Sequence, residues 1–295
     1  MKYERINDYL KIFIDDSYEG KTIKEFFDDL SLSRKTIHLL RQNKEYTINH
    51  QYKSYDEILH KGDVLDILAY DHDDHMYRPL YEDINIVYED ELILVVNKPP
   101  FLPVYPDRKD KTDSLSNMVS GYYHSIGEDI PVRFIHRLDV ETSGLVMFVK
   151  CLLIQSLLDL QLSKKEIERK YLAVVENKLE RQEGRITGKI GRDRHSNKMR
   201  ISKTGKPAFT EYEVLKTIGD RTLVECTLKT GRTHQIRVHM ASIGHPLVGD
   251  TLYGRASKDI KRQALHAYQL TFTHPLSKEV ITLEAELPED MKQLI

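Results

Sequence analysis

The stretch R-F-I-H-R-L-D-V-E-T-S-G-L-V-M-F-V-K, residues 133–150, carries most of what the sequence tells about the fold. Its second half, residues 144–150, is strongly apolar and predicts a buried strand. Polar and charged residues interrupt the run just before a Thr-Ser-Gly turn. Asp139 is therefore expected on a loop held by a strand, where rigid scaffolds display reactive groups. The residues alone leave a second interpretation open, in which Asp139 caps the turn by accepting backbone hydrogen bonds.

Strand-like runs on both sides of this stretch predict a domain dominated by a sheet. The acidic turn at residues 89–91 separates two apolar runs and suggests a hairpin. We expect strands at residues 84–88, 93–96, 144–150, 171–176, 209–215, 223–228 and 269–272, and helices at residues 113–124, 152–164 and 233–243. Because helices do not alternate regularly with strands, the pattern favours an α+β fold with a mixed, largely antiparallel sheet.

The first 75 residues read as a separate small α+β domain. We expect helices at residues 21–30 and 33–42 and strands at residues 46–48 and 64–69. The pattern resembles the S4-type RNA-binding module: Ser33-Arg34 and Lys61-Gly62-Asp63 fit it, whereas Asn49-His50 stands where that module usually has Asn-Gly. Residues 1–80 hold 16 Asp and Glu against 12 Lys and Arg. RNA contact and a purely structural role therefore both stay open for this module.

The boundary between the two parts is expected around residue 76. Residues 71–74 are mostly acidic and Pro79 follows shortly after, without any periodicity, so this region reads as a linker. The predicted organisation is a small domain at residues 1–75, a linker at residues 76–82 and a larger domain at residues 83–295.

Composition bounds the class of protein. Cys151 and Cys226 lie far apart in the sequence, which argues against a disulfide framework. No apolar run approaches the roughly 20 residues that span a bilayer, and no signal-like stretch follows the N-terminus, so we expect a soluble cytoplasmic protein. The net charge is only −2, but residues 181–206 hold nine basic residues against two acidic ones, which predicts one markedly cationic surface.

A second polar block, G-R-T-H-Q-I-R-V-H at residues 231–239, is dense in groups that recognise phosphates, base edges or carboxylates. If residues 233–243 are helical, Thr233, Arg237 and Met240 share one face, and Arg237 is able to pair with a carboxylate from a neighbouring loop. A zinc site at His234 and His239 is a weak alternative, because their spacing differs from the i,i+4 pattern of helical zinc ligands.

Together these blocks resemble the RluA-type pseudouridine synthases, over roughly residues 83–289. The run H-R-L-D-V-E-T-S-G at residues 136–144 is similar to that family's signature. Three further blocks agree in order: K-Y-L-A at residues 170–173, G-R-T-H-Q-I-R-V-H at 231–239, and L-H-A at 265–267 followed by F-T-H-P at 272–275. Phe101 and Tyr105 depart from the family, which usually has Gly and His there, and put the conformation of that loop in doubt.

The resemblance implies a pseudouridine synthase fold and an enzyme that isomerises uridines in structured RNA, ribosomal or transfer, as a monomer without cofactor or metal. It implies that the catalytic Asp139 attacks C6 of the base or assists departure of uracil from C1′, that Arg237 orients Asp139, and that Tyr171 stacks on the uracil and helps to remove the C5 proton. It also implies that the uridine is flipped out of its stem and that Arg137 fills the vacated space. The residues expected to contact RNA are His136, Arg137, Arg185, Lys189, Arg192, Arg194, Lys198, Arg200, Arg232 and His234.

Two other classes stay open. A protein with the same fold could bind or fold RNA without turnover, which loss of one catalytic group would produce. A carboxylate-based glycosidase or nucleoside hydrolase normally needs a second acid, and none stands out beside Asp139 in the sequence.

Overall fold

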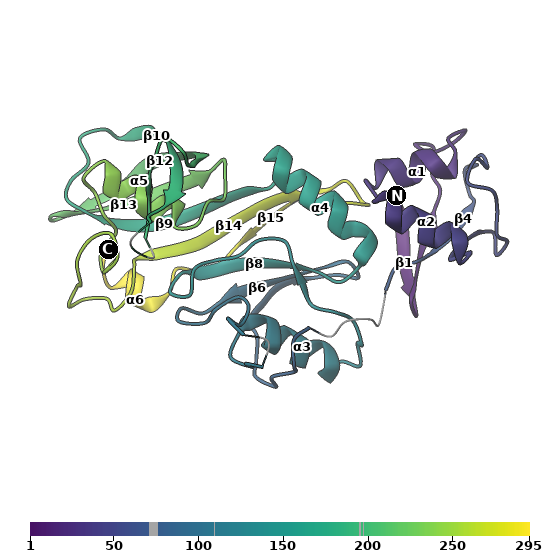
Figure 1. Cartoon of the computed structure of the whole chain (residues 1–295), viewed down its shortest axis with the longest axis horizontal. Coiled ribbons are helices and arrows are strands. Elements are labelled where there is room, and N and C mark those ends of the chain that lie inside the picture. Colours follow the sequence, from purple (N-terminus) through teal and green to yellow (C-terminus); the bar gives the residue numbers. More distant parts are fainter. Residues whose placement is uncertain (71–75, 109, 195, 197) are drawn as a thin grey trace.

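Two separate sheets organise the chain (Figure 1). The computed structural model describes residues 1–70, 76–108, 110–194, 196 and 198–295. A four-stranded sheet lies in the N-terminal part and an 11-stranded sheet in the remainder, so the expected α+β class with a mixed sheet is confirmed. Among the described residues, no helix combines the length and the apolar character needed to cross a bilayer.

The N-terminal sheet has the strand order β1-β2-β4-β3 and packs against two helices. Its elements are β1 (Lys2–Ile6), β2 (Tyr9–Phe13), α1 (Ile23–Asp29), α2 (Arg34–Gln42), β3 (Tyr46–Ile48) and β4 (Val64–Leu68). Thr22 and Ser33 cap the two helices, as their side-chain oxygens accept from backbone N–H groups. The strands β1 and β2 were not predicted, because their charged residues alternate with apolar ones in a segment that reads as polar.

The turn after β3 forms despite its unusual sequence. Asn49 and His50 both have left-handed backbones, with φ of 48° and 64°. The Asn49 side chain also bonds Asp63 and the backbone N–H of Val64. His50 therefore occupies a conformation for which Gly is the usual choice.

The large sheet runs in the order β11-β10-β12-β13-β9-β14-β8-β6-β5, with β15 added on β14 and β7 on β8. Its strands are β5 (Ile86–Glu89), β6 (Ile93–Lys98), β7 (Arg133–Phe134), β8 (Ser143–Val149), β9 (Glu168–Glu176), β10 (Glu183–Arg192), β11 (Met199–Ile201), β12 (Lys206–Ile218), β13 (Arg221–Leu228), β14 (Leu265–Thr273) and β15 (Val280–Glu284). Among the described strands, β8 and β14 form the one parallel pair. Every residue of β8 is buried, as the apolar run predicts.

Four helices accompany this sheet: α3 (Leu115–Ser125), α4 (Leu152–Lys164), α5 (Gln235–Ser242) and α6 (Glu289–Lys292). The bounds of α4 agree with the prediction. The prediction for α5 was wrong at its start, because His234 has a left-handed backbone (φ 57°) and precedes the helix. Thr233 therefore lies outside the helix and shares no helical face with Arg237.

Sequence reasoning also missed the hairpin of β10 and β11. Residues 181–206 were expected to form a charged surface stretch, yet β10 pairs with both β12 and β11 along its length. Ile186 and Ile190 are buried there while Arg185 and Lys189 are exposed. Gly184, Gly188 and Gly191 interrupt the alternating pattern in the sequence, and pairing with β12 decides the conformation instead.

The predicted linker region is only partly described. The acidic run at residues 71–74 lies outside the described residues. Residues 76–82 contain no helix or strand but pack on α3: the Asn117 side chain donates to the Arg78 carbonyl (2.8 Å) and Ser120 to the Tyr77 carbonyl (3.0 Å).

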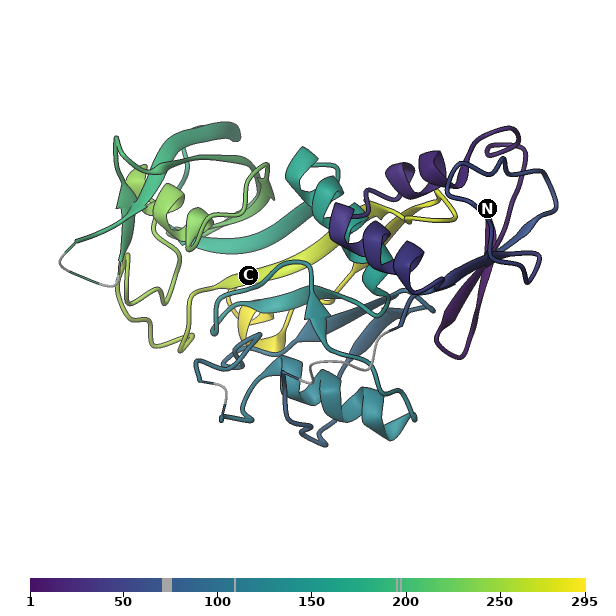
Figure 2. The same cartoon turned by 45° about the vertical axis from the view of Figure 1, so that its right-hand side comes forward.

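The N-terminal part docks on the end of the large sheet, beside the β14–β15 hairpin (Figure 1, Figure 2). The Tyr3 ring stacks on His274 with 5.6 Å between centroids. Arg5 forms an ion pair with Glu128 at 2.6 Å, and the Tyr70 hydroxyl donates to the Glu91 carbonyl at 2.7 Å. The contacts are polar as well as apolar, which fixes the orientation of the two sheets more closely than apolar packing alone.

At Gly144, the parallel strands β8 and β14 lie too close together for a side chain. Gly144 has φ of +116°, and a Cβ there would lie 2.2 Å from the Ala267 carbonyl oxygen of β14. We expect Gly144→Ala to lower the free energy of unfolding by about 3 kcal/mol or more, since both backbone strain and a backbone clash result. Urea unfolding measures the change.

Gly219→Ala is the matched control, because Gly219 also has a positive φ (+60°) but nothing within 4 Å of a new Cβ. It should lower the free energy of unfolding by only about 1–2 kcal/mol, the cost of the left-handed conformation. Equal losses of stability in the two variants would refute the clash between β8 and β14.

Candidate active site

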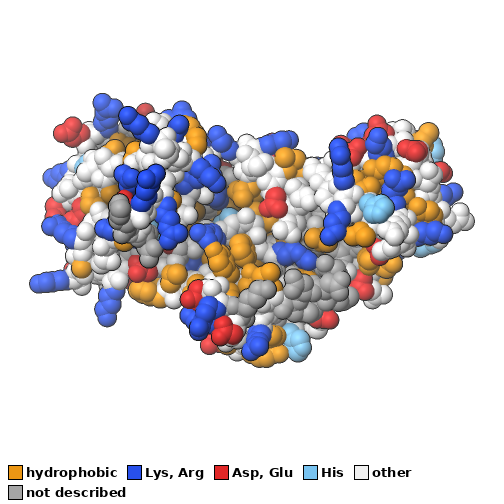
Figure 3. All heavy atoms as spheres, viewed as in Figure 1, with side chains coloured by type: hydrophobic (Ala, Val, Ile, Leu, Met, Phe, Trp, Pro, Cys, Tyr) orange, Lys and Arg blue, Asp and Glu red, His pale blue; other side chains and the backbone are white. Residues whose placement is uncertain are grey.

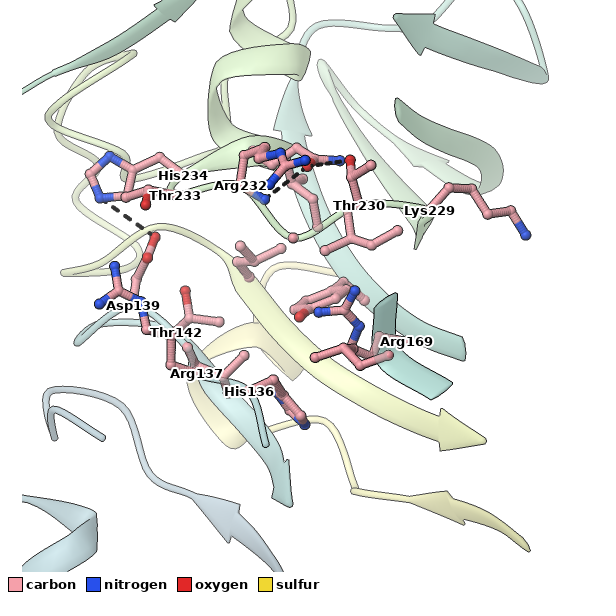
Figure 4. A pocket seen from close by; sticks show the side chains of 18 of the residues that line it. His136, Arg137, Asp139, Thr142, Arg169, Lys229, Thr230, Arg232, Thr233 and His234 are labelled. Carbon is pink, nitrogen blue, oxygen red and sulfur yellow. Dashed lines mark hydrogen bonds and ion pairs between the residues drawn. The ribbon is translucent and has the colours of Figure 1, made fainter. Parts of the chain in front are cut away.

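A pocket of about 620 Å³ lies where the loop before β8, the end of α4, the start of β9 and the segment before α5 meet. Figure 3 shows Lys and Arg side chains around the hollow on this face, and Figure 4 shows the pocket from close by. Seven residues predicted from the sequence line it together: Asp139, Tyr171, Arg237, His136, Arg137, Arg232 and His234.

The loop that carries Asp139 connects β7 to β8 and is fastened from below by two buried cations. Lys98 Nζ donates to the Val140 carbonyl (3.1 Å) and to two carbonyls of its own loop, those of Pro99 (2.9 Å) and Leu102 (2.8 Å). Arg262 Nη1 donates to the Glu141 carbonyl (3.1 Å). The two carbonyls that follow Asp139 are thus both held, which limits the positions open to its carboxylate.

Both cations are fully buried. Arg262 is compensated by a bidentate ion pair with Asp290 (2.7 and 2.9 Å). Burial, together with the charge of Arg262, lowers the pKa of Lys98 to about 7. Its three carbonyl acceptors favour the ammonium form, which has one N–H for each.

Arg237 holds Asp139 from the other side. Its Nη1 donates to Asp139 Oδ2 at 3.1 Å, while Nε and Nη2 form a bidentate pair with Asp250 at 2.7 and 2.9 Å. Arg237 was expected to pair with a carboxylate of a neighbouring loop. Its bidentate partner in the structure is Asp250, whereas Asp139 receives a single hydrogen bond. The Asp250 side chain is fully buried and also accepts from the backbone N–H groups of Leu252 and Tyr253. Arg237 is consequently held in one orientation.

Arg237 stays protonated in this environment. Burial lowers its pKa, but the hydrogen bonds and charge of Asp250, with those of Asp139, raise it by more, so the net pKa lies above the ordinary value. Asp139 in turn keeps about a quarter of its side chain exposed to the pocket. The site thus presents a positioned, accessible carboxylate beside a permanent cation.

His234 is a further neighbour of Asp139, with Nε2 at 3.9 Å from Oδ2, as the dashed line in Figure 4 marks. Its Nδ1 lies 2.8 Å from the Tyr253 hydroxyl, which accepts from the backbone N–H of Met199 in β11. Burial lowers the pKa of His234, which favours the neutral ring. His239, by contrast, bonds Thr210 in the protein interior, and the described residues contain no group of three or more potential metal ligands.

Tyr171 and His136 lie deep in the pocket. Both are more than nine-tenths buried. Burial raises the pKa of Tyr171, so its hydroxyl stays protonated near neutral pH. Burial and the charge of Arg169 lower the pKa of His136 to about 3, so its ring is neutral. His136 was expected to contact RNA, and its burial confines any such contact to the inside of the pocket.

Arg137 stands exposed at the mouth of the pocket. Its guanidinium bonds the Tyr105 hydroxyl and lies 5.5 Å from the centroid of the Tyr105 ring, which itself stacks on Phe134. Tyr105, one of the departures from the family pattern, therefore supports Arg137 from below. The arrangement leaves the positive charge of Arg137 open to solvent.

The basic residues of the β10–β11 hairpin do not line the pocket. They are exposed on these two strands and on the turn between them: Arg185, Lys189, Arg192, Arg194, Lys198 and Arg200. Arg200 pairs with Asp193 at 3.1 Å. They lie at the end of the sheet that β10 and β11 form, away from the N-terminal sheet (Figure 1).

Sequence reasoning missed five residues that shape the site: Lys98, Arg169, Asp250, Tyr253 and Arg262. Asp250 and Tyr253 lie in the G-D-T-L-Y-G run, residues 249–254, which carried no assigned role. Arg169 had a usable signal, since it lies two residues before Tyr171, just ahead of the strand predicted at residues 171–176, and continuing the alternation of that strand places both on one face. Lys98 had none, because a lysine after an apolar strand normally reads as exposed.

Comparisons with known proteins match both parts of the chain. The family model described as RNA pseudouridylate synthase matches residues 92–242, and the model of the RluD ribosomal pseudouridine synthase N-terminal domain matches residues 10–65. The chain is 39% identical to YhcT, an uncharacterised RNA pseudouridine synthase of Bacillus subtilis, over 97% of this chain and 96% of that protein.

Two further relatives extend the likeness. The chain is 34% identical to the ribosomal large subunit pseudouridine synthase D of Pasteurella multocida, over 93% of this chain and 89% of that protein. A solved structure, the human RNA pseudouridylate synthase domain containing 1, is similar with a TM-score of 0.58 and 28% identity, over 72% of this chain and 86% of that one.

Lys98 offers a test of how the Asp139 loop is held. We expect Lys98→Met to lower the free energy of unfolding by at least about 1–3 kcal/mol, because it leaves buried carbonyls without donors. Urea unfolding measures the change, with Lys111→Met as a control that removes a partly exposed lysine of the surface. Unchanged stability would mean that the carbonyls of Pro99, Leu102 and Val140 do not depend on Lys98.

Proposed function

Because this chain belongs to the RNA pseudouridylate synthase family, we propose that it isomerises particular uridines of structured RNA with Asp139 as the catalytic carboxylate. As a member it is an RNA pseudouridine synthase. The observation that supports the role of Asp139 is its place in the pocket: it is accessible, bonded by Arg237, and carried by a loop that Lys98 and Arg262 fasten.

Asp139 and Arg237 act as a unit in this proposal. The carboxylate has two chemically open routes, attack at C6 of the base or assistance of uracil departure from C1′, and both need it ionised and aimed at the nucleoside. Arg237 orients Asp139, since its Nε and Nη2 are bonded to Asp250 while its Nη1 donates to Asp139. Such preorganisation removes reorientation of the charged groups from the barrier.

Tyr171 is assigned to stacking on the uracil. It is a large aromatic side chain at the floor of the pocket, and its raised pKa disfavours the phenolate that a base would require. The role of Tyr171 in removing the C5 proton, expected from the resemblance, is therefore the weaker part of its assignment.

The target uridine has to leave its stack to reach Asp139, and base flipping is part of the proposal. Arg137 is exposed at the mouth of the pocket, on the same loop as Asp139. In this proposal Arg137 occupies the space that the uridine vacates. Flipping the uridine itself costs a few kcal/mol of unstacking.

Ribosomal RNA is the substrate that we propose first, with transfer RNA as the alternative. Support comes from relatives named for the ribosomal large subunit, which are 34–42% identical to this chain. The glycosidase alternative has less support, because Asp139 is the single carboxylate among the described residues that line the pocket.

The proposed reaction is tested by release of tritium from RNA labelled at uridine C5. We expect Asp139→Ala to reduce release by roughly 10⁴-fold or more, the scale for removal of an essential group. Glu141→Gln, a carboxylate of the same loop, is the matched control and should retain activity. Salt-sensitive RNA binding without any release by the wild-type protein would instead favour a non-catalytic RNA-binding protein, and release of free uracil a hydrolase.

The hairpin of β10 and β11 is proposed to grip the phosphate backbone. Lys189→Ala combined with Lys198→Ala should weaken RNA affinity and reduce the slope of log affinity against log salt by about 0.7–0.9 for each phosphate that the protein no longer neutralises. The rate at saturating RNA should stay the same. Lys216→Ala, at the opposite end of β12 from the hairpin, is the control; an unchanged salt slope in the double variant would contradict this role.

A further inference from the structure

Arg169 brings an unpaired guanidinium into the pocket. It is the second residue of β9, and Arg169 and Tyr171 share one face of the strand, whereas Lys170 faces the other side and pairs with Glu225 at 2.9 Å. Among the described residues, no carboxylate lies within ion-pair distance of Arg169, and its Nε is buried without a hydrogen-bond partner. Arg169 as a whole is half-buried, so the rest of its guanidinium is available to a ligand that enters the pocket.

Gly231 provides the room for this side chain. A Cβ at Gly231 would lie 3.0 Å from Arg169 Nη1, closer than an ordinary contact. The guanidinium therefore rests against the backbone of the G-R-T-H segment, which confines it to the pocket side. Other basic residues there are less confined: Lys229, for example, is 37% exposed and lies 3.5 Å from Glu211.

The charges of both Arg169 and Asp139 act on Tyr171, which lines the same pocket. Burial is the main cause of its raised pKa, and the charge of Arg169 opposes this while that of Asp139 adds to it. Figure 4 shows Asp139 and Arg169 separated across the pocket. A uracil stacked on Tyr171 with its ribose at Asp139 would therefore extend its far edge toward Arg169.

The atom at that far edge is O4, which stands opposite N1 on the ring. Both routes open to Asp139 place negative charge on it. When a carboxylate oxygen bonds to C6, the electron pair of the C5–C6 double bond moves into an enolate that ends on O4. When the N1–C1′ bond breaks instead, its electron pair stays on the uracil and is shared by N1, O2 and O4.

Either route then closes to an isomer of the starting uridine. The N1–C1′ bond breaks if it is still intact, the C5–C1′ bond forms, the bond to Asp139 breaks if one was made, C5 loses its proton and N1 gains one. The charge at O4 exists only during these steps, so a donor placed there stabilises the transition state more than the bound substrate.

We propose that Arg169 is a further catalytic residue, whose guanidinium donates to O4 of the flipped uracil and stabilises the charge that develops there. The same contact rejects cytosine, which carries an amino donor at C4 in place of the O4 acceptor. This proposal rests on the proposed function of Asp139 and adds the group that recognises the opposite edge of the base.

The test compares Arg169→Ala, Arg169→Lys and Lys170→Met, the last of which removes the neighbouring cation from the opposite face of β9. Single-turnover tritium release at saturating enzyme and RNA affinity by filter binding are measured for each. Arg169→Ala should lose roughly 10²–10³-fold in rate, the scale for one oxyanion donor, with affinity changed less than about twofold. Arg169→Lys should recover part of the rate, and Lys170→Met should match the wild type.

Guanidinium chloride at millimolar concentration separates a catalytic role from a structural one. It should partly restore the rate of Arg169→Ala, whereas sodium chloride at equal ionic strength should not. Absence of rescue, or weaker affinity with an unchanged saturating rate, would overturn the proposal, the latter result indicating a phosphate contact.

Gly231→Ala keeps the proposal falsifiable if Arg169→Ala does not fold. It displaces the guanidinium by a few tenths of an ångström without removing charge, and it should slow single-turnover release at unchanged affinity. A wild-type rate in Gly231→Ala would count against the proposal. The Arg169 variants could also keep full activity while tritium release by the wild type still depends on Asp139. That result would refute the role of Arg169 alone and leave the proposed function intact.

Discussion

Two carboxylates share one buried guanidinium, and the arrangement of the pocket depends on that sharing. Asp250 has no exposed side-chain surface and satisfies its oxygens with Arg237 and with two backbone N–H groups. Removing such a charge from water is costly unless it is paired and hydrogen-bonded, so Arg237 is kept in place. Nη1, the nitrogen that Asp250 does not bond, donates to Asp139 Oδ2 at 3.1 Å.

Three sets of cations differ in their physical roles. Lys98, Arg237 and Arg262 are buried and partnered, and they hold the backbone and the carboxylate of the Asp139 loop. Arg169 enters the pocket without a partner among the described residues. The residues of the β10–β11 hairpin are exposed, where ion pairs contribute little to stability but phosphates are attracted strongly. A net charge of −2 conceals this division.

Strand β14 connects these regions. It pairs in parallel with β8, whose N-terminal end follows the Asp139 loop, and in antiparallel fashion with β9, which carries Arg169 and Tyr171. Just beyond its far end, His274 stacks on Tyr3 of the N-terminal domain. The position of that domain relative to the pocket is therefore set through the sheet itself, by direct contact rather than by the linker alone.

Local pattern determined a large part of this protein. The apolar run at residues 144–150 predicted the fully buried β8, periodicity located α4 at Leu152–Lys164, and the ordered motifs identified the family. The same motifs singled out Asp139, Tyr171 and Arg237 as the residues proposed for the site. Periodicity and motifs act over a few neighbouring residues, which is why they were readable. The strands β1, β2, β10 and β11 were not, because pairing with other strands, rather than local preference, stabilises them.

Only the tertiary structure decided that Asp250 takes the bidentate bonds of Arg237, that Lys98 fastens the Asp139 loop, and that Arg169 faces the pocket with no carboxylate beside it among the described residues. Asp139 and Arg237 are 98 residues apart in the chain, and contacts over such separations depend on how the strands pack, which no local pattern specifies.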